Sequence, residues 1–410
     1  MEYKLPRGII SHNISDSFYV FLKSLLYRSR DQSKVEEFEL ELSSRLNAKF
    51  CKSFGLARTA IYFILKYLNH PPGTKILLSP ITIKGILDVV VYLGYEPVYL
   101  DIDDSTYVPS IDSIEGLDSD IKVAIITPLY GVIPDIENIS KSLKKKDIFS
   151  LLDFSHCFDA KFKNVQINNY FDASVYSSSS IKILDTLGGG HALTDIESLN
   201  NYLHECQQSS SAPSRINLIK KSWINLVRNL ATQKFLFSLF TFPVIKGLTK
   251  YSGFSTLKMT GDRDKLRLEN LPRNWFNQFS SFQAQIGLNE LKKTIFNDRQ
   301  RIMHARKIIR SVGKEYFASD NFQDNVYWQL IFQVKDSGHF QKYCLNKGVD
   351  VATSSLLLIS DLEQYSGKKF LKNAKDLYIS GCLIPCNYRM NSTDLEKICF
   401  VLNRYINENP

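Results

Sequence analysis

The segment SLLDFSHCFDA places a carboxylate and an imidazole, Asp153 and His156, directly after an apolar run. In an open α/β sheet, ligands bind at the carboxyl ends of the strands. A carboxylate backed there by Leu151 and Leu152 could hold a pyridinium proton through a charge-assisted hydrogen bond. Aspartate is also a favoured helix N-cap, and this segment alone favours neither role.

A second segment, VYSSSSIKILDTLGGGHAL, runs from an expected strand into serines, a lysine and three glycines. A lysine that forms a Schiff base needs a constrained loop, and nearby hydroxyls and glycine amides can bind a phosphate. Lys182 and Ser177 are the candidates for these two roles. A flexible loop with a solvated lysine is the alternative, and the segment taken by itself favours it.

The third segment, SFGLARTAIYFILKYL, is a small-residue turn followed by an apolar helix. The backbone amides and the dipole at such a helix start can bind a phosphate. Arg58 and Thr59 lie at that turn. Helix starts of this kind are common, so the signal is weak in isolation.

The elements around these residues must position them. Short apolar runs alternate there with helix-like segments, and this alternation predicts a largely parallel sheet. The expected strands are Ile76–Leu78, Pro97–Asp101, Val123–Thr127, Ile148–Asp153 and Ala173–Ser177, and the expected helices between them are Lys84–Leu93 and Ile136–Leu143. Gln278–Val312 should form a long helix or helix pair, and Ser392–Asn407 a closing helix. We expect a large cofactor-binding domain with an N-terminal arm over residues 1–250, and a bridging helix with a small α+β domain over 251–410.

The chain has 410 residues and an ordinary globular composition. Its formal net charge of +9 favours acidic partners. The sequence has no signal peptide pattern and no nucleic-acid-binding motif, so we expect a soluble cytoplasmic protein that does not bind nucleic acid. The seven cysteines are scattered. Cys382 and Cys386 lack a second ligand pair at zinc spacing, so no metal site is expected.

Taken together and in order, these segments resemble the DegT-type (DnrJ/StrS) nucleotide-sugar aminotransferases of the fold-type I group. The resemblance covers about residues 45 to 195 and resumes from about 275 to the C-terminus. Further matching segments are Ser79–Ile83, LGYEPVYLDID ending at Asp103, Gln283–Leu288 and Leu383–Pro385. No single motif is decisive, but five occur in the family order.

The resemblance implies a three-layer α/β/α large domain around a mixed sheet, a smaller C-terminal domain and a homodimer with shared active sites. It also implies pyridoxal 5'-phosphate as cofactor, an amino donor such as glutamate and a nucleotide-linked keto-sugar as acceptor, in surface polysaccharide or glycoconjugate synthesis. In the implied cofactor site, Lys182 forms the Schiff base and Asp153 contacts the ring nitrogen. His156 and Ile83 contact the ring, and the phosphate is bound by Ser177, Arg58 and Thr59. Asn277, with Asn274 as the alternative, would reach the phosphate from the neighbouring subunit.

Three positions depart from the family pattern. Ile83 replaces an aromatic residue, Gly188 replaces an acidic one, and the motif around Asn277 is blurred. A non-catalytic paralogue that binds a sugar nucleotide or a protein is therefore an alternative, as is an aminotransferase for a different, lipid-bearing ketone. A sugar dehydratase of the same fold is disfavoured, because those relatives have histidine in place of Lys182.

The stretch from Ile216 to Leu248 fits the family pattern least, since it is apolar and basic without any acidic residue. A helical insert that packs on the large domain or at the dimer contact is the favoured interpretation. The alternative is peripheral contact with the inner face of a membrane, where apolar side chains enter the interface and basic ones meet anionic headgroups. Lys234 and Pro243 interrupt the run, which argues against spanning a bilayer.

Overall fold

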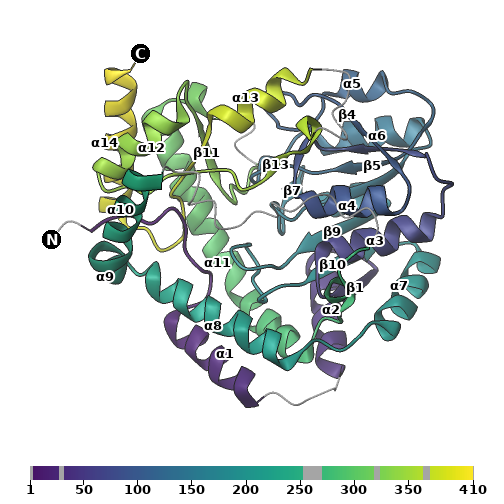
Figure 1. The fold of residues 1–410 in the computed structure, drawn as a ribbon. Coiled ribbons are helices and arrows are strands. Elements are labelled where there is room, and N and C mark those ends of the chain that lie inside the picture. Colours follow the sequence, from purple (N-terminus) through teal and green to yellow (C-terminus); the bar gives the residue numbers. More distant parts are fainter. Residues whose placement is uncertain (1–2, 27–31, 253–269, 318–323, 363–369, 410) are drawn as a thin grey trace.

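The computed structural model describes residues 3–26, 32–252, 270–317, 324–362 and 370–409 (Figure 1). Its centre is a seven-stranded sheet in the order β1-β10-β9-β6-β5-β2-β4. The strands are β1 (Phe50–Phe54), β2 (Lys75–Leu78), β4 (Glu96–Tyr99), β5 (Ile121–Ile126), β6 (Phe149–Asp153), β9 (Ala173–Ser177) and β10 (Gly190–Thr194). Only β10 runs antiparallel to its neighbours, so the sheet is mixed but mostly parallel.

Helices cover both faces of this sheet, because successive strand residues point to opposite sides. Leu77 packs with one core cluster, whereas Ile76 and Leu78 pack with the other. The first cluster contains residues of α2 (Ser33–Arg45), α5 (Ile111–Glu115), α6 (Ile136–Lys145) and the start of α11 (Ser281–Val312), and the second contains residues of α3 (Ala57–Leu68), α4 (Lys84–Tyr92) and α7 (Glu197–Ser209). The predicted three-layer α/β fold is therefore confirmed.

A smaller sheet lies in the C-terminal part of the chain, in the order β11-β14-β12. Its elements are β11 (Leu330–Gln333), β12 (Ala352–Thr353) and β14 (Gly381–Ile384), with α12 (Ser337–Asn346), α13 (Lys372–Ser380) and α14 (Ser392–Glu408). The carboxyl half of α11 packs on α14 and joins this part to the large sheet. The remaining short elements are β3 (Ile81–Thr82), β7 (Lys161–Phe162), β8 (Val165–Gln166), β13 (Leu357–Leu358), η1 (Ile167–Tyr170), η4 (Arg273–Phe276), η5 (Lys314–Tyr316) and η6 (Ile359–Asp361).

The N-terminal arm, residues 4–13, crosses from the small sheet to the large one. Leu5 forms a parallel bridge with Val349, and Arg7 pairs with Asp350 at 2.6 Å. The arm leads into α1 (Ile14–Leu26), which packs beside α8 (Arg215–Ala231) at one edge of the molecule (Figure 1).

The chain continues from α8 through α9 (Lys234–Leu236) and a π-helical turn, η2 (Phe237–Thr241), to α10 (Phe242–Ser252). Phe237 and Phe242 are buried with Leu345 of the small domain. The stretch 216–248 is thus helical, as expected, and packs partly on the protein. Residues 253–269, just after the expected domain boundary, lie outside the described residues.

Candidate active site

Asp153 and Ser177 lie at the same edge of the central sheet, because their strands are parallel neighbours. The register pairs Asp153 of β6 with Val175 of β9, so Ser177 follows at the carboxyl end. Ser177 donates its backbone N–H to Ser155 Oγ at 3.1 Å, and Ser155 Oγ donates to Asp153 Oδ1 at 2.5 Å. Two of the three predicted chemical segments therefore meet at the edge where open α/β sheets bind ligands.

The Asp153 carboxylate is buried, and its Oδ1 also accepts the Ser155 backbone N–H at 3.1 Å. The carboxylate therefore closes a turn; no helix begins within residues 154–166, so the helix-cap alternative is wrong. Burial raises the pKa of Asp153, while the Ser155 hydrogen bonds and the charge of Lys182 act in the opposite direction. A buried carboxylate of this kind gains stability from a further positive partner.

Lys182 lies in the loop between β9 and β10, and its backbone N–H donates to the Ser179 carbonyl at 3.0 Å. Burial lowers the pKa of its amine to about 7, and the carboxylate of Asp153 opposes this shift. The preceding Ile181 has a φ of +74°, a strained conformation for a β-branched residue. The predicted lysine is thus on a constrained loop with a partly buried side chain, which argues against a fully solvated lysine.

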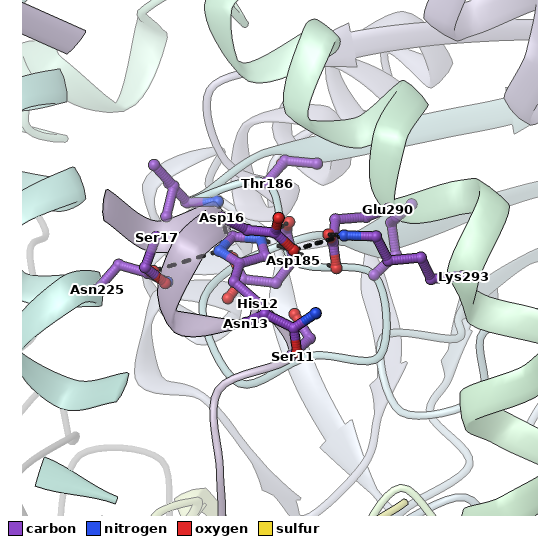
Figure 2. A network of polar contacts seen from close by, with 12 residues as sticks. Ser11, His12, Asn13, Asp16, Ser17, Asp185, Thr186, Asn225, Glu290 and Lys293 are labelled. Atoms are coloured by element: carbon purple, nitrogen blue, oxygen red, sulfur yellow. Dashed lines mark hydrogen bonds and ion pairs between the residues drawn. The ribbon is translucent and has the colours of Figure 1, made fainter. Parts of the chain in front are cut away.

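Buried polar contacts fix the loop after Lys182 (Figure 2). His12 of the N-terminal arm places Nε2 3.0 Å from the Asp185 carbonyl and Nδ1 3.2 Å from Asn225 Oδ1 of α8. Burial lowers the pKa of His12, but the carboxylates of Asp185 and Glu290 and the hydrogen bonds outweigh it, so the pKa is raised. The arm, α8 and α11 therefore all hold the segment that carries Lys182.

A small hydroxyl cluster fixes the start of the same loop. Ser178 Oγ lies 2.6 Å from Thr186 Oγ1 and 2.7 Å from His191 Nε2 of β10. At Gly190 a side chain is excluded, since a Cβ would lie 2.1 Å from the backbone nitrogen of Ala57. The glycine run therefore lets the Lys182 loop approach the start of α3 closely.

The start of α3 is suited to an anion. Leu56 at its N-cap provides no side-chain hydrogen bond, and the first turn has no acidic residue. Thr59 donates its hydroxyl to the Trp275 carbonyl at 2.5 Å, and the Arg58 guanidinium carbon lies 4.5 Å from the Trp275 ring centre. The positive end of the helix and the Arg58 charge thus act together.

Arg58 and Ile83 come from neighbouring helix starts. A Cβ on Gly85 of α4 would lie 2.3 Å from Arg58 Nη1, so this glycine leaves room for the guanidinium. Ile83 is the N-cap of α4 and is partly buried. The Asn277 carbonyl accepts the Gly55 N–H at 2.9 Å, which places Asn277 near the start of α3 in its own chain.

An aromatic stack around His156 escaped the sequence analysis. The His156 ring lies between Tyr130, at 6.0 Å, and Trp328, at 4.0 Å between ring centres, and is nearly parallel to both. Burial and the Lys182 charge keep the pKa of His156 well below its ordinary value, so Nδ1 accepts the Tyr130 N–H at 3.1 Å. Lys182 Nζ lies 3.9 Å from the centre of the Trp328 ring.

Comparisons with known proteins show the family of the chain and relatives of its fold. The DegT/DnrJ/EryC1/StrS aminotransferase family matches residues 13–221. The spore coat polysaccharide biosynthesis protein SpsC of Bacillus subtilis is 27% identical over 174 residues, which are 40% of this chain and 43% of that protein. GDP-perosamine synthase of Escherichia coli O157:H7 is 23% identical over 166 residues, covering 40% of this chain and 46% of that protein. The matches therefore span less than half the length of these relatives.

Two solved structures resemble the whole chain. An aminotransferase from Helicobacter pylori, PseC, involved in the biosynthesis of pseudoaminic acid, gives a TM-score of 0.74 at 16% identity over 99% of this chain and 100% of that one. An aminotransferase from Psychrobacter cryohalolentis gives a TM-score of 0.75 at 17% identity, covering 98% and 99% of the two chains. At these identities the likeness shows the fold alone.

Proposed function

The chain belongs to the DegT/DnrJ/EryC1/StrS aminotransferase family, and on this premise we propose that it is a pyridoxal-phosphate-dependent aminotransferase. The observation that carries the proposal is the arrangement at the carboxyl edge of the sheet, where Ser155 links Asp153 to Ser177 and Lys182 lies on the loop that follows Ser177. Burial lowers the pKa of Lys182 to about 7, and the charge of Asp153 opposes this shift. A buried amine that is easily deprotonated, coupled to a buried carboxylate, is the arrangement that carbonyl chemistry on a lysine needs.

The residues present fit the cofactor. Asp153 would hold the ring nitrogen, and the uncapped start of α3, with Arg58 and Ser177, would hold the phosphate. The hydroxyl of Thr59, the third residue predicted there, donates instead to the Trp275 carbonyl. Lys182 would carry the group covalently, and Ile83 would contact its ring. His156, whose ring is stacked on Tyr130 and Trp328, would contact the cofactor ring by its edge. When bound, pyridoxal phosphate supplies an electron sink for the carbanion that forms at the donor α-carbon.

The chain's own residues perform the proton chemistry. Asp153 keeps a proton on the ring nitrogen, because its buried carboxylate stabilises a positive partner. Once the donor has displaced it from the cofactor, the neutral amine of Lys182 would accept the proton of the donor α-carbon and deliver it to the carbonyl carbon of the cofactor. Burial and the Lys182 charge keep His156 neutral, and Tyr130 and Trp328 stack on its ring.

We further propose that the amino donor is glutamate and the acceptor is a keto group on a nucleotide-linked deoxysugar. This proposal is supported by relatives named GDP-perosamine synthase and UDP-2-acetamido-2-deoxy-3-oxo-D-glucuronate aminotransferase. The product would enter surface polysaccharide or glycoconjugate synthesis in the cytoplasm. A homodimer in which Asn277 reaches the partner's phosphate site is part of the proposal.

The test is to incubate purified protein with glutamate and a panel of nucleotide-linked keto-sugars, and to measure 2-oxoglutarate. The protein should show cofactor absorbance, and borohydride should fix the cofactor to Lys182. Lys182→Ala should abolish both the fixed cofactor and 2-oxoglutarate formation. A protein without cofactor absorbance that still binds sugar nucleotides would support the non-catalytic alternative, and cofactor fixed to the Lys182→Ala protein would refute the assignment.

A further inference from the structure

Helix α8 packs on the protein with a largely polar side. Its buried residues include Ser222, Asn225 and Asn229. Asn225 Oδ1 accepts from Ser17 Oγ of α1 at 2.9 Å, and Asn229 Nδ2 donates to the His12 carbonyl at 2.6 Å. This is the reverse of an ordinary surface helix, which buries its apolar stripe.

The opposite side of α8 is apolar and exposed. Their spacing places four exposed apolar residues on one face of the helix: Ile216, Trp223, Val227 and Leu230. The side chain of Trp223 is 51% exposed. Helix α1 repeats the pattern, since it buries Ser17 and Ser24 and exposes Ile14, Phe18, Leu22 and Leu25.

These two exposed stripes form one continuous surface, which we call the outer face. The helices lie side by side at the edge of the molecule (Figure 1). Phe21 and Trp223 join the stripes, with ring centres 5.3 Å apart. A contiguous apolar surface of this kind marks an interaction site.

The charges around the outer face select the partner. No aspartate or glutamate occurs from residue 206 to 261. The outer face carries the exposed Lys23 of α1 and Lys220 of α8, and Arg215 donates to the Leu25 carbonyl between the two helices. Lys221 and Arg228 of α8 face the other way, toward Gly188 and Asp185. Asp16, the acidic residue of α1, pairs with Lys293 of α11 at 2.6 Å. A twofold contact between two copies of this face would bring basic residues opposite basic residues. An anionic surface would instead complement them.

We propose that the outer face binds an anionic phospholipid bilayer. Trp223 and Phe18 enter the interface between headgroups and acyl chains, and Lys23, Arg215 and Lys220 contact the headgroups. Both helices lie flat on the surface, and within the described part of the chain no helix is long and apolar enough to cross a bilayer. The proposal does not depend on the aminotransferase activity.

Flotation of the full-length, cofactor-loaded protein with vesicles tests it. Vesicles of phosphatidylcholine with phosphatidylglycerol should bind the protein, binding should fall as salt is raised, and phosphatidylcholine alone should not bind it. Lys23→Gln with Lys220→Gln should weaken the vesicle affinity by about tenfold, since each charge near the surface contributes to binding. Phe18→Ser with Trp223→Ser should abolish binding.

A matched control replaces two equally exposed apolar residues at the other end of the molecule, Ile379 of α13 and Phe400 of α14, by serine (Figure 1). This control should bind like the unchanged protein. Equal binding to neutral vesicles, no binding at all, or unchanged binding of the Phe18→Ser, Trp223→Ser protein would overturn the proposal. So would conversion of a dimer to monomers by those two substitutions in sedimentation experiments, because the face would then join two copies. Cofactor absorbance of each variant reports separately on the active site.

Discussion

The side-chain amine of Lys182 is easily deprotonated. Burial lowers its pKa to about 7, and the Asp153 carboxylate limits the shift. Such an amine is neutral in a large fraction of molecules near neutral pH, which a solvated lysine is not. Ile181 has a strained backbone conformation, and Trp328 Nε1 donates to the Ile181 carbonyl at 2.8 Å. These two features hold the neighbouring amine in this environment.

The pKa of Lys182 can be measured directly in protein freed of cofactor. Competitive acetylation across pH, read by mass spectrometry of the Lys182 peptide, should give a midpoint near 7. Asp153→Asn should lower this midpoint further, because the carboxylate is what opposes the burial effect. A midpoint near that of a free lysine would show that the amine is solvated.

Asp153→Asn should preserve the fold, since an amide oxygen can accept the same two hydrogen bonds from Ser155. Turnover should fall by about two to three orders of magnitude, because a neutral amide does not stabilise a proton on the ring nitrogen. Steady-state kinetics should show that kcat falls. Thermal unfolding of the variant is the control that its fold is intact. Near-normal turnover would leave Asp153 a purely structural role.

Among the elements, the strands that carry the chemistry could be predicted from the sequence. β6 and β9 are apolar runs that end at Asp153 and Ser177, and parallel neighbours bring such ends together. β1 and β10 could not be predicted, since FCKSF is short and GHALT begins at the third glycine of a glycine run. Trp328 escaped because its contact with His156 depends on how the small domain packs, which no local pattern encodes.

The contact between β10 and α3 has a steric test. Gly190→Ala should destabilise the protein by about 3 kcal/mol, because the new methyl group would overlap the backbone of Leu56 and Ala57. Gly247→Ala is the matched control, since nothing lies within 4 Å of its Cβ position in α10. This control should be neutral or stabilising by up to about 1 kcal/mol. Urea unfolding compares the two, and equal stabilities would contradict the close packing.

His12 should make stability depend on pH. Its pKa is raised above 6.5 in the folded chain, so the folded state holds this proton more tightly than the unfolded state. The contribution is complete below pH 6.5 and is lost as pH rises through the folded pKa. The difference in unfolding free energy between wild type and His12→Gln should therefore shrink from pH 6 to pH 9. A constant or growing difference would mean that His12 is neutral in the folded protein.

For the whole molecule, the family implies shared active sites, whereas Asn277 lies near α3 of its own chain. Mixing Lys182→Ala chains with Asn277→Ala chains distinguishes the two arrangements. If Asn277 serves the partner's site, each hybrid dimer contains one intact site, and activity should return to about one quarter of wild type. If Asn277 serves its own site, the mixture should show only the residual activity of the separate variants, measured before mixing.

The N-terminal arm also determines when the molecule can be completed during synthesis. Arg7 finds its partner Asp350 across 343 residues, and Leu5 pairs with Val349. At ribosomal rates of roughly 10 residues per second, the arm waits about half a minute for these partners. His12 reaches the Lys182 loop from that same arm. Arg389 of the small domain donates to the His12 carbonyl at 2.8 Å. The arm that carries His12 is therefore held by the small domain only after that domain has emerged.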